Sequence, residues 1–309
     1  MKRIYYIVWF VLLCILPESK NYGQNQMDVA QYMFHQPIIN PASATSYEEV
    51  NAALLSRQQW IGFEGAPKLN VLNVNMPFLK TSAGVSVLHE KLGVHTNTRF
   101  WASYAYRTRL STDKYLSFGL SAGALFMKDD LDAVTSIEGN DTEFLLDQNI
   151  TRADFQLGLY YFSRKYYLGL TIPSLLNNQI YYDPEERKQR PDYNPKYYHY
   201  YLQAGYELAL HKDWDLNVSS LVKYLVDTSF DADFNAQLRY QKRYGAGLSY
   251  RTTKEALAFV NLRLTPMFKL GYAYQYTFGL GHEKLSSHEV MLIFSMDKPA
   301  TAIIQSPRF

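Results

Sequence analysis

Long apolar runs are missing from most of this 309-residue chain, although 47% of its residues are hydrophobic and 16% are aromatic. A membrane-spanning helix needs about 17–25 consecutive, predominantly apolar residues, and no stretch after the first twenty positions approaches that length. The mean hydropathy is −0.26, so polar residues are interleaved with the apolar ones. The sequence therefore excludes a bundle of membrane-spanning helices.

Cysteine is nearly absent, and neither sign of charge dominates. Because Cys14 is the only cysteine, the rest of the chain can carry neither a disulfide framework nor a cysteine-based metal site. The 31 Lys and Arg residues and the 29 Asp and Glu residues give a net charge of +2, without the basic run that suggests nucleic-acid binding.

The first residues have the features of a secretory signal peptide. Two basic residues precede an apolar run at 4–16, a polar stretch follows at 17–21, and we expect cleavage near Gly23. An N-terminal core helix is disfavoured because the run has no polar face, and a lipid anchor is disfavoured because Leu13 precedes Cys14. Export without disulfides fits the bacterial envelope.

From about residue 50 onward, apolar and polar residues alternate with a period of two, which is the pattern of β-strands with two different faces. In residues 115–125 the even positions are apolar and the odd positions are mostly Ser and Gly. In residues 231–240, Ala, Phe, Leu and Tyr alternate with Asp, Asn, Gln and Arg. One such face could lie in hydrocarbon, and aromatic residues near strand ends are typical of outer-membrane barrels.

About fourteen such segments follow one another along the chain. They are 50–59, 68–77, 82–90, 96–109, 114–127, 152–162, 165–173, 196–210, 214–226, 230–240, 244–252, 255–264, 267–278 and 287–295. If the first strand runs outward, the long connections all fall on one side, at 60–67, 128–151, 174–195 and 279–286. The sequence therefore predicts an all-β fold, a transmembrane antiparallel β-barrel of about 14 strands with short periplasmic turns, longer extracellular loops and both termini on the periplasmic side.

The alternative fold is a soluble β-sandwich or propeller, which also alternates but builds its core from Val, Ile and Leu in shorter strands. Here Tyr, Phe, Leu and Ala dominate the apolar face, and only closure satisfies the backbone of a sheet in lipid. The expected division of the chain is 1–23 signal peptide, 24–49 N-terminal periplasmic or plug segment, 50–295 outer-membrane barrel and 296–309 C-terminal tail.

The polar face carries charges of both signs. The cations are Arg99, Arg107, Arg152, Lys223, Arg239, Arg251, Arg263 and Lys269, and the anions are Asp154, Glu207, Asp215, Asp231 and Asp233. Opposite charges in a closed lumen can pair and fill space, whereas a selective pore tends toward rings of one sign. We expect a narrow or plugged lumen, with segment 24–49 or the two long loops as the plug. A polar, water-filled interior is the alternative.

No catalytic or metal-binding motif was found in the sequence. The seven histidines are dispersed without ligand spacing, and the acidic loop 128–151 lacks the ordered frame of a calcium loop, so we interpret it as a solvated loop. The aromatic, turn-rich loop 174–195 is interpreted as a partner surface or a packed lid. We therefore expect no enzyme activity, no cofactor and no metal.

Two motifs flank the first strand. Residues 31–42 read QYMFHQPIINPA, and residues 57–67 read RQQWIGFEGAP. Their Asn-Pro and Gly-x-x-Gly turns fix the entry of the chain and its first reversal. With the signal peptide and the repeated amphipathic strands, they resemble the opening of the PorP/SprF family of type IX secretion system outer-membrane proteins. The sequence departs from that pattern at His35, where Asn is expected, and at 43–46, which replace a Tyr-Ala-Gly continuation.

This resemblance implies a non-catalytic multi-pass barrel in the outer membrane of Bacteroidota. It would support secretion or cell-surface anchoring of cargo proteins, including gliding adhesins, together with a periplasmic peptidoglycan-linked protein and lipoproteins. The motif positions implied as partner-binding or structural are Asn40, Pro41, Ala42, Arg57, Gln59, Trp60, Gly62, Gly65, Ala66 and Pro67. Their structural role would be to position the first strand.

Two other functions stay open at this stage. The size of the barrel alone permits an outer-membrane diffusion channel or a ligand-specific transporter. An outer-membrane lipid enzyme would need a Ser and a His paired on the outer rim, and no sequence pattern places such a pair.

Overall fold

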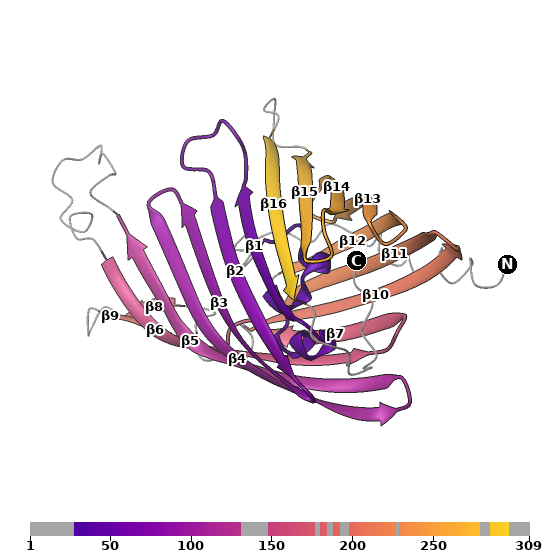
Figure 1. Ribbon diagram of the computed structural model, residues 1–309. Coiled ribbons are helices and arrows are strands. Elements are labelled where there is room, and N and C mark those ends of the chain that lie inside the picture. Colours follow the sequence, from indigo (N-terminus) through magenta and orange to yellow (C-terminus); the bar gives the residue numbers. More distant parts are fainter. Residues whose placement is uncertain are drawn as a thin grey trace.

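Fourteen antiparallel strands pair into a closed barrel in the computed structural model of the chain (Figure 1). Around the wall the order is β1-β16-β15-β14-β13-β12-β11-β10-β7-β6-β5-β4-β3-β2, so the barrel closes where β1 pairs with β16. The strands are β1 (Val50–Gln58), β2 (Lys68–Phe78), β3 (Thr81–Leu92), β4 (His95–Ser111), β5 (Lys114–Asp129), β6 (Gln148–Phe162), β7 (Tyr166–Ile172), β10 (His199–His211), β11 (Trp214–Leu225), β12 (Ser229–Tyr240), β13 (Tyr244–Arg251), β14 (Glu255–Arg263), β15 (Phe268–Thr277) and β16 (Leu285–Met296). The prediction of an all-β barrel of about fourteen strands is confirmed.

The structure describes residues 28–130, 148–176, 180–183, 188–191, 198–226, 229–278 and 285–296. The expected signal peptide, most of the acidic loop and the C-terminal tail lie outside these residues. Within the described residues, no helix has the length and apolar character needed to cross a membrane.

Alternation in the sequence becomes alternation of burial in each strand. Along β2, Leu69 and Val71 point inward and are buried, whereas Leu72 and Met76 point outward and are 45% and 44% exposed. Successive side chains of a strand point to opposite faces, so one face of the wall is apolar and exposed while the other faces the lumen. The outward face is therefore the surface that meets lipid.

A small hairpin lies within the connection predicted at 174–195. Strands β8 (Ile180–Asp183) and β9 (Lys188–Pro191) form a separate two-stranded sheet. The sequence did not predict it, because four-residue strands are too short to establish a period.

The connections differ between the two ends of the barrel. At one end, here called the short-turn end, every connection has four residues or fewer: 79–80, 112–113, 163–165, 212–213, 241–243 and 264–267. The other end, the long-loop end, carries 59–67, 93–94, 130–147, 173–198, 226–228, 252–254 and 278–284. In bacterial outer-membrane barrels short turns face the periplasm and longer loops face outward, so the long-loop end is extracellular.

Residues 28–47, here called the lumen segment, lie inside the barrel, where their short helical turns are visible in indigo in Figure 1. The segment contains three 3-10 turns, η1 (Tyr32–Phe34), η2 (Gln36–Ile38) and η3 (Pro41–Ser46). Every residue from 29 to 47 is buried. The segment thus occupies the space that would otherwise be the pore.

The lumen segment runs from the long-loop end to the short-turn end. Asp28 accepts a hydrogen bond from Gln59, which directly follows β1 at the long-loop end. Thr45 accepts one from Arg107, which also binds the carbonyl of Leu79 in a short turn. The first strand, β1, begins at the short-turn end and the last strand, β16, ends there, as expected. Asp28, the first described residue, lies at the opposite end, where the cations that bind it are located.

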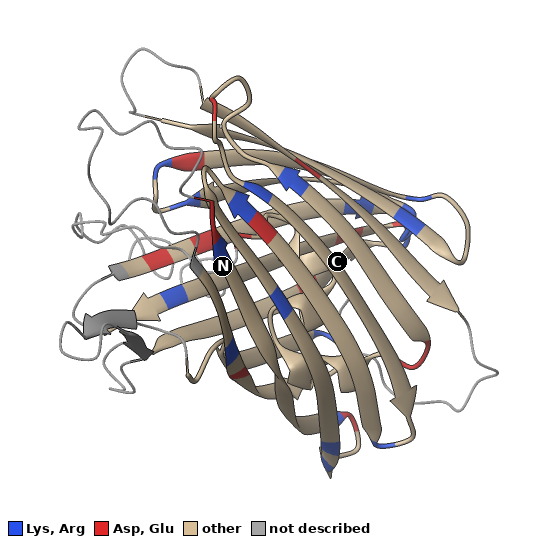
Figure 2. Cartoon of the chain, turned by 90° about the vertical axis from the view of Figure 1, so that its left-hand side faces the viewer, with Lys and Arg blue, Asp and Glu red and all other residues tan. Residues whose placement is uncertain are grey.

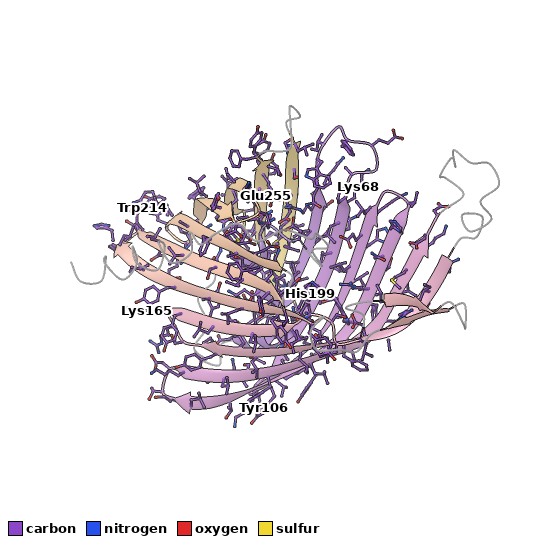
Figure 3. The ribbon with its side chains drawn as sticks, turned by 180° about the vertical axis from the view of Figure 1, so that it is seen from behind. Lys68, Tyr106, Lys165, His199, Trp214 and Glu255 are labelled. Carbon is purple, nitrogen blue, oxygen red and sulfur yellow. The ribbon has the colours of Figure 1, made fainter. Side chains whose placement is uncertain are left out.

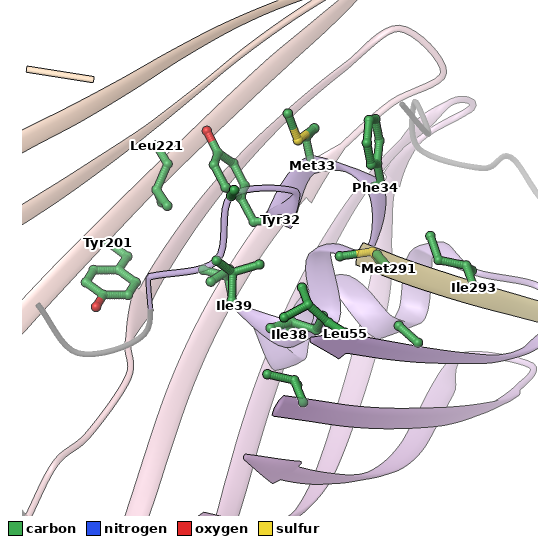
Figure 4. Packing of buried hydrophobic residues seen from close by; sticks show 14 of the residues in the cluster. Tyr32, Met33, Phe34, Ile38, Ile39, Leu55, Tyr201, Leu221, Met291 and Ile293 are labelled. Atoms are coloured by element: carbon green, nitrogen blue, oxygen red, sulfur yellow. The ribbon is translucent and has the colours of Figure 1, made fainter. Parts of the chain in front are cut away.

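The apolar core of the protein lies between the lumen segment and the wall (Figure 4). Tyr32, Phe34 and Ile39 of the segment belong to one buried cluster with side chains from opposite sides of the barrel, including Leu55, Tyr201, Leu221, Met291 and Ile293. The ring of Phe34 meets that of Phe259 edge-on, with centroids 5.6 Å apart. Burial of apolar surface is the main favourable contribution to folding, so the segment stabilises the barrel from within.

Candidate functional site

Arg57 of the second motif points from β1 into the lumen, where its side chain is 1% exposed. Its Nη2 donates to Asp28 Oδ2 at 2.6 Å and to Gln275 Oε1 at 2.7 Å, and its Nη1 lies 3.5 Å from Glu289 Oε2. A guanidinium has five donors in a planar fork, which suits it to several acceptors at once. Arg57 therefore joins the lumen segment to the wall.

Asp28 lies among three cations. Its Oδ1 is 2.5 Å from Arg251 and 3.7 Å from Lys223, and its Oδ2 accepts from Arg57 and, at 3.0 Å, from Gln59. Burial alone would raise the pKa of this carboxyl, but Arg251, Arg57 and Lys223 outweigh it and hold the pKa well below its ordinary value. Asp28 is thus a carboxylate at neutral pH, and two residues of the motif, Arg57 and Gln59, bind it.

The side chain of Glu289 on β16 forms hydrogen bonds with the backbone of the lumen segment. Its two carboxyl oxygens accept from the N–H groups of Ala30 and Gln31, each at 2.8 Å, and the Gln31 side chain donates to the Glu289 carbonyl at 3.2 Å. Glu289 is also the direct cross-strand partner of Arg57 at the β1–β16 closure. We name the set of Asp28, Arg57, Lys223, Arg251 and Glu289 the ionic anchor.

A second hold on the lumen segment is made by Asn40, which is fully buried. Its Oδ1 accepts from the N–H of Ala42 at 3.0 Å and so caps η3, which Pro41 begins. Its Nδ2 donates to the carbonyl of Leu159 at 2.9 Å and lies 3.4 Å from that of Leu170. One amide therefore caps the turn and binds the wall, and both halves of the amide are used.

Glycines in the wall make the space for this turn. Gly119 and Gly158 are direct partners across β5 and β6, and Gly169 lies on the neighbouring β7. A Cβ at Gly119 would lie 2.7 Å from the Cα of Ala42, and one at Gly169 would lie 2.9 Å from Nδ2 of Asn40. The Asn-Pro-Ala motif therefore packs against backbone where any side chain would displace it.

The end of the lumen segment is held at the short-turn end. Arg107 Nη1 donates to the carbonyl of Thr45 at 2.5 Å and Nη2 donates to that of Leu79 at 2.7 Å, while the hydroxyls of Thr45 and Ser117 share a short hydrogen bond. The segment is thus fixed at its start, its middle and its end.

The rest of the second motif forms the extracellular loop between β1 and β2. Three of its residues have positive φ: Trp60 at 45°, Gly62 at 92° and Gly65 at 74°. Glycine adopts such angles without steric cost, which explains both glycines of the motif. The N–H of Gln59 closes the base of the loop on the carbonyl of Pro67 at 2.9 Å.

This loop is bonded to its neighbours and presents apolar side chains. The N–H of Ile61 donates to the carbonyl of Ser286 at 2.9 Å, and the N–H of Gly93 donates to that of Gly65 at 2.8 Å. Ile61 and Phe63 nevertheless remain 44% and 56% exposed. A braced loop with exposed apolar groups has the character of a binding surface.

Three of the cations predicted for the lumen, Lys223, Arg239 and Arg251, form ion pairs there with acidic side chains, among them the predicted Glu207, Asp215 and Asp233. Figure 2 shows charged positions as separate bands on strands that otherwise carry no charge. Arg239 pairs with Glu207 at 2.9 Å and with Asp215 at 3.1 Å at the short-turn end. The ionic anchor adds Asp28 and Glu289, which the sequence did not single out. In the described part of the chain, no group of three His, Cys, Asp or Glu residues could hold a metal ion.

The ten motif positions therefore separate into three places. Asn40, Pro41 and Ala42 lie in the glycine-lined part of the lumen, Arg57 and Gln59 meet at Asp28, and Trp60, Gly62, Gly65, Ala66 and Pro67 shape the extracellular loop. The structural role expected for them has a physical basis at each place. Their contact with a partner stays a prediction.

A closed antiparallel barrel with an apolar outer face and a segment filling its lumen defines an outer-membrane β-barrel protein. The family model for the type IX secretion system membrane protein PorP/SprF matches residues 21–294. The chain belongs to this family, as its two motifs predicted, and it lies in the outer membrane. Family and fold resemble outer-membrane barrels and channels rather than enzymes.

Among solved structures, the toluene transporter TbuX of Ralstonia pickettii is similar with a TM-score of 0.50 at 9% sequence identity, over 85% of this chain and 92% of that chain. The toluene transporter TodX of Pseudomonas putida has a TM-score of 0.45 at 8% identity, over 86% of this chain and 93% of its own. The likeness to TbuX supports the barrel fold alone. No curated protein matches the sequence.

Proposed function

We propose that this barrel is a non-catalytic scaffold of the type IX secretion system, which supports secretion or cell-surface anchoring of cargo proteins by binding partners. The observation that carries the proposal is the filled lumen: residues 29–47 are buried inside the barrel. Since its own chain occupies the pore, the barrel can bind partners only through its outer surface, its loops and its turns.

The attachment of the lumen segment argues against a diffusion channel. The ionic anchor holds its start, Asn40 its middle and Arg107 its end. Removing one member of a buried, paired set of charges costs about 3–5 kcal/mol, so release of the segment is expected to be costly. A passive channel or ligand-specific transporter, the second function that barrel size permits, would need that release.

Partners are expected on both sides of the membrane. The extracellular loop with exposed Ile61 and Phe63 is the surface we assign to cargo or to another outer-membrane component. The short turns face the periplasm, where the family resemblance implies a peptidoglycan-linked protein and lipoproteins. Gliding adhesins are one cargo class this proposal includes.

Affinity purification from mild detergent tests the proposal directly. We expect the tagged barrel to retain type IX components and cargo, and we expect deletion of its gene to change the exported and surface-attached protein profile. An unchanged profile in the deletion strain would overturn the scaffold function.

Recording in planar lipid bilayers separates the scaffold from the channel. The purified barrel is expected to be electrically silent, because the lumen segment fills the pore. A steady open conductance of the unaltered protein would favour the diffusion channel. That result would contradict a plugged scaffold, even if the purification retained secretion partners.

A further inference from the structure

Three lysines form one row on the lipid-facing side of the barrel, near the extracellular end. Lys68 on β2 pairs directly with Lys91 on β3, Lys91 pairs with Thr96 on β4, and Thr96 pairs with Lys128 on β5. All three lysines are exposed, and Lys68 is labelled in Figure 3. Neighbouring strands lie about 4.8 Å apart, so the row spans about 15 Å along the wall.

The row has no acidic counterpart within the described strands β2 to β5. No Asp or Glu occupies an outward-facing position in the described strands β2 to β5, and none of the three lysines lies within ion-pair distance of an acidic residue in the described part of the chain. Like charges directly opposite each other destabilise a sheet. The pair of Lys68 and Lys91 therefore points to an external anion.

Polarity changes in order below the lysines, toward the middle of the membrane. The next row is Asn70, His89, Thr98 and Phe126, in which His89 Nδ1 and Thr98 Oγ1 are 2.9 Å apart. The row below that is Leu72, Val87, Phe100 and Ala124, which is wholly apolar. Cations, then hydrogen-bonding groups, then an apolar row on the protein are complementary to the phosphates, the sugar hydroxyls and the acyl chains of a phosphorylated glycolipid.

The row is confined to one side of the barrel. On the opposite side the exposed outward-facing strand residues nearest the extracellular end are Tyr224, Phe230 and Tyr250, and the exposed Lys254 lies beyond them in the turn 252–254. These aromatics form the ordinary interfacial belt of a barrel. Lysines placed only to meet headgroups in general would be expected around the whole circumference.

We propose that Lys68, Lys91 and Lys128 bind the phosphate groups of a phosphorylated glycolipid in the outer leaflet, whose acyl chains lie against β2 to β5. The site goes beyond the scaffold function and needs only the outer-membrane location. The site would hold one lipid beside the loop between β1 and β2. That loop lies on the same side of the barrel, since it is hydrogen-bonded to Gly93 in the β3–β4 turn.

The test compares the full-length barrel with the triple variant Lys68→Gln, Lys91→Gln, Lys128→Gln. A matched triple variant, Lys114→Gln, Lys165→Gln, Lys242→Gln, removes three exposed lysines at the short-turn end. Native mass spectrometry in detergent measures the binding of diphosphorylated lipid A, of the same lipid A with its phosphates removed, and of phosphatidylglycerol.

Diphosphorylated lipid A is expected to bind the first variant at least about tenfold more weakly than the wild type, since the variant lacks all three cations that attract its phosphates. The matched variant should bind it like the wild type, and dephosphorylated lipid A should bind the wild type as weakly as the first variant binds the intact lipid.

Three results would overturn the proposal: unchanged binding by the first variant, equal weakening in the matched variant, or phosphatidylglycerol binding as tight as that of lipid A. The last result would indicate a general anionic surface. Should the triple variant fail to fold, the single variant Lys91→Gln, in the middle of the row, is measured instead, and unchanged binding there would equally contradict the site.

Discussion

Arg57 and Asp28 form a 2.6 Å ion pair between the first barrel strand and the first described residue of the lumen segment. Arg57 lies opposite Glu289 in the strand pair that closes the barrel, and Glu289 in turn binds two backbone N–H groups of the segment. The filling of the lumen and the closure of the wall therefore depend on the same side chains. A change in one should be felt in the other.

The first prediction concerns Asp28→Asn. The substitution leaves Arg57, Arg251 and Lys223 around a neutral amide, so we expect the free energy of unfolding to fall by about 3–4 kcal/mol, the lower part of the range for breaking buried ion pairs. Equilibrium denaturation of the purified barrel in detergent measures this loss. The same variant should show transient conductance in planar bilayers, because the start of the segment is released.

Asp129→Asn is the matched control for Asp28→Asn. Asp129 pairs with His95 at 2.7 Å, but the His95 side chain is 55% exposed. Exposed pairs contribute about 0–1 kcal/mol, so this variant should keep its stability and stay silent. If the two variants behave alike, the ionic anchor does not hold the segment.

The second prediction compares two substitutions of Asn40. Asn40→Ala removes the cap of η3 and the hydrogen bond to Leu159, and we expect a loss of about 1–3 kcal/mol. Asn40→Asp keeps an acceptor for the cap but sets a carboxylate against the carbonyl oxygens of Leu159 and Leu170. It should be at least as destabilising as Asn40→Ala in the same denaturation assay. A stable Asn40→Asp variant would show that the cap matters and the wall contact does not.

The third prediction concerns the glycines against which the Asn-Pro-Ala turn packs. Gly119→Ala places a methyl group against the backbone of Ala42. Neither the strand nor the turn can easily move away from it, and overpacking of this kind costs about 1–3 kcal/mol. Ala122→Leu on the same strand adds a larger group on the lipid side and should leave stability unchanged. Equal effects of the two would mean that the turn does not sit tightly on the wall.

Most of the fold could be predicted because the signal is local. Alternation along residues 230–240 assigns both the strand and the side that faces the lumen, and the observed strand runs from 229 to 240. The hairpin of β8 and β9 and the extension of β6 back to residue 148 escaped notice, since short or polar stretches carry no clear period.

The site was less predictable, because it depends on contacts between distant parts of the chain. Arg57 and Glu289 are separated by 232 residues and meet only when the barrel closes. Asp28 is one acidic residue in a region without periodic pattern. Gly119 reads in the sequence as a small member of a polar face, and its role depends on the turn of the first motif that packs against it.

The last prediction separates the two roles of the second motif. Ile61→Ser and Phe63→Ser change exposed side chains of the extracellular loop and leave its backbone hydrogen bonds intact, so stability should change by no more than about 0.5 kcal/mol. If the loop binds a partner, these variants should lose that partner in affinity purification while the lumen stays closed in bilayer recordings. Arg57→Lys should do the reverse: it keeps the charge but lacks the fork that reaches both Asp28 and Gln275, so stability falls while the loop is unchanged. Retention of every partner by the Ile61 and Phe63 variants would leave the motif with its structural role alone.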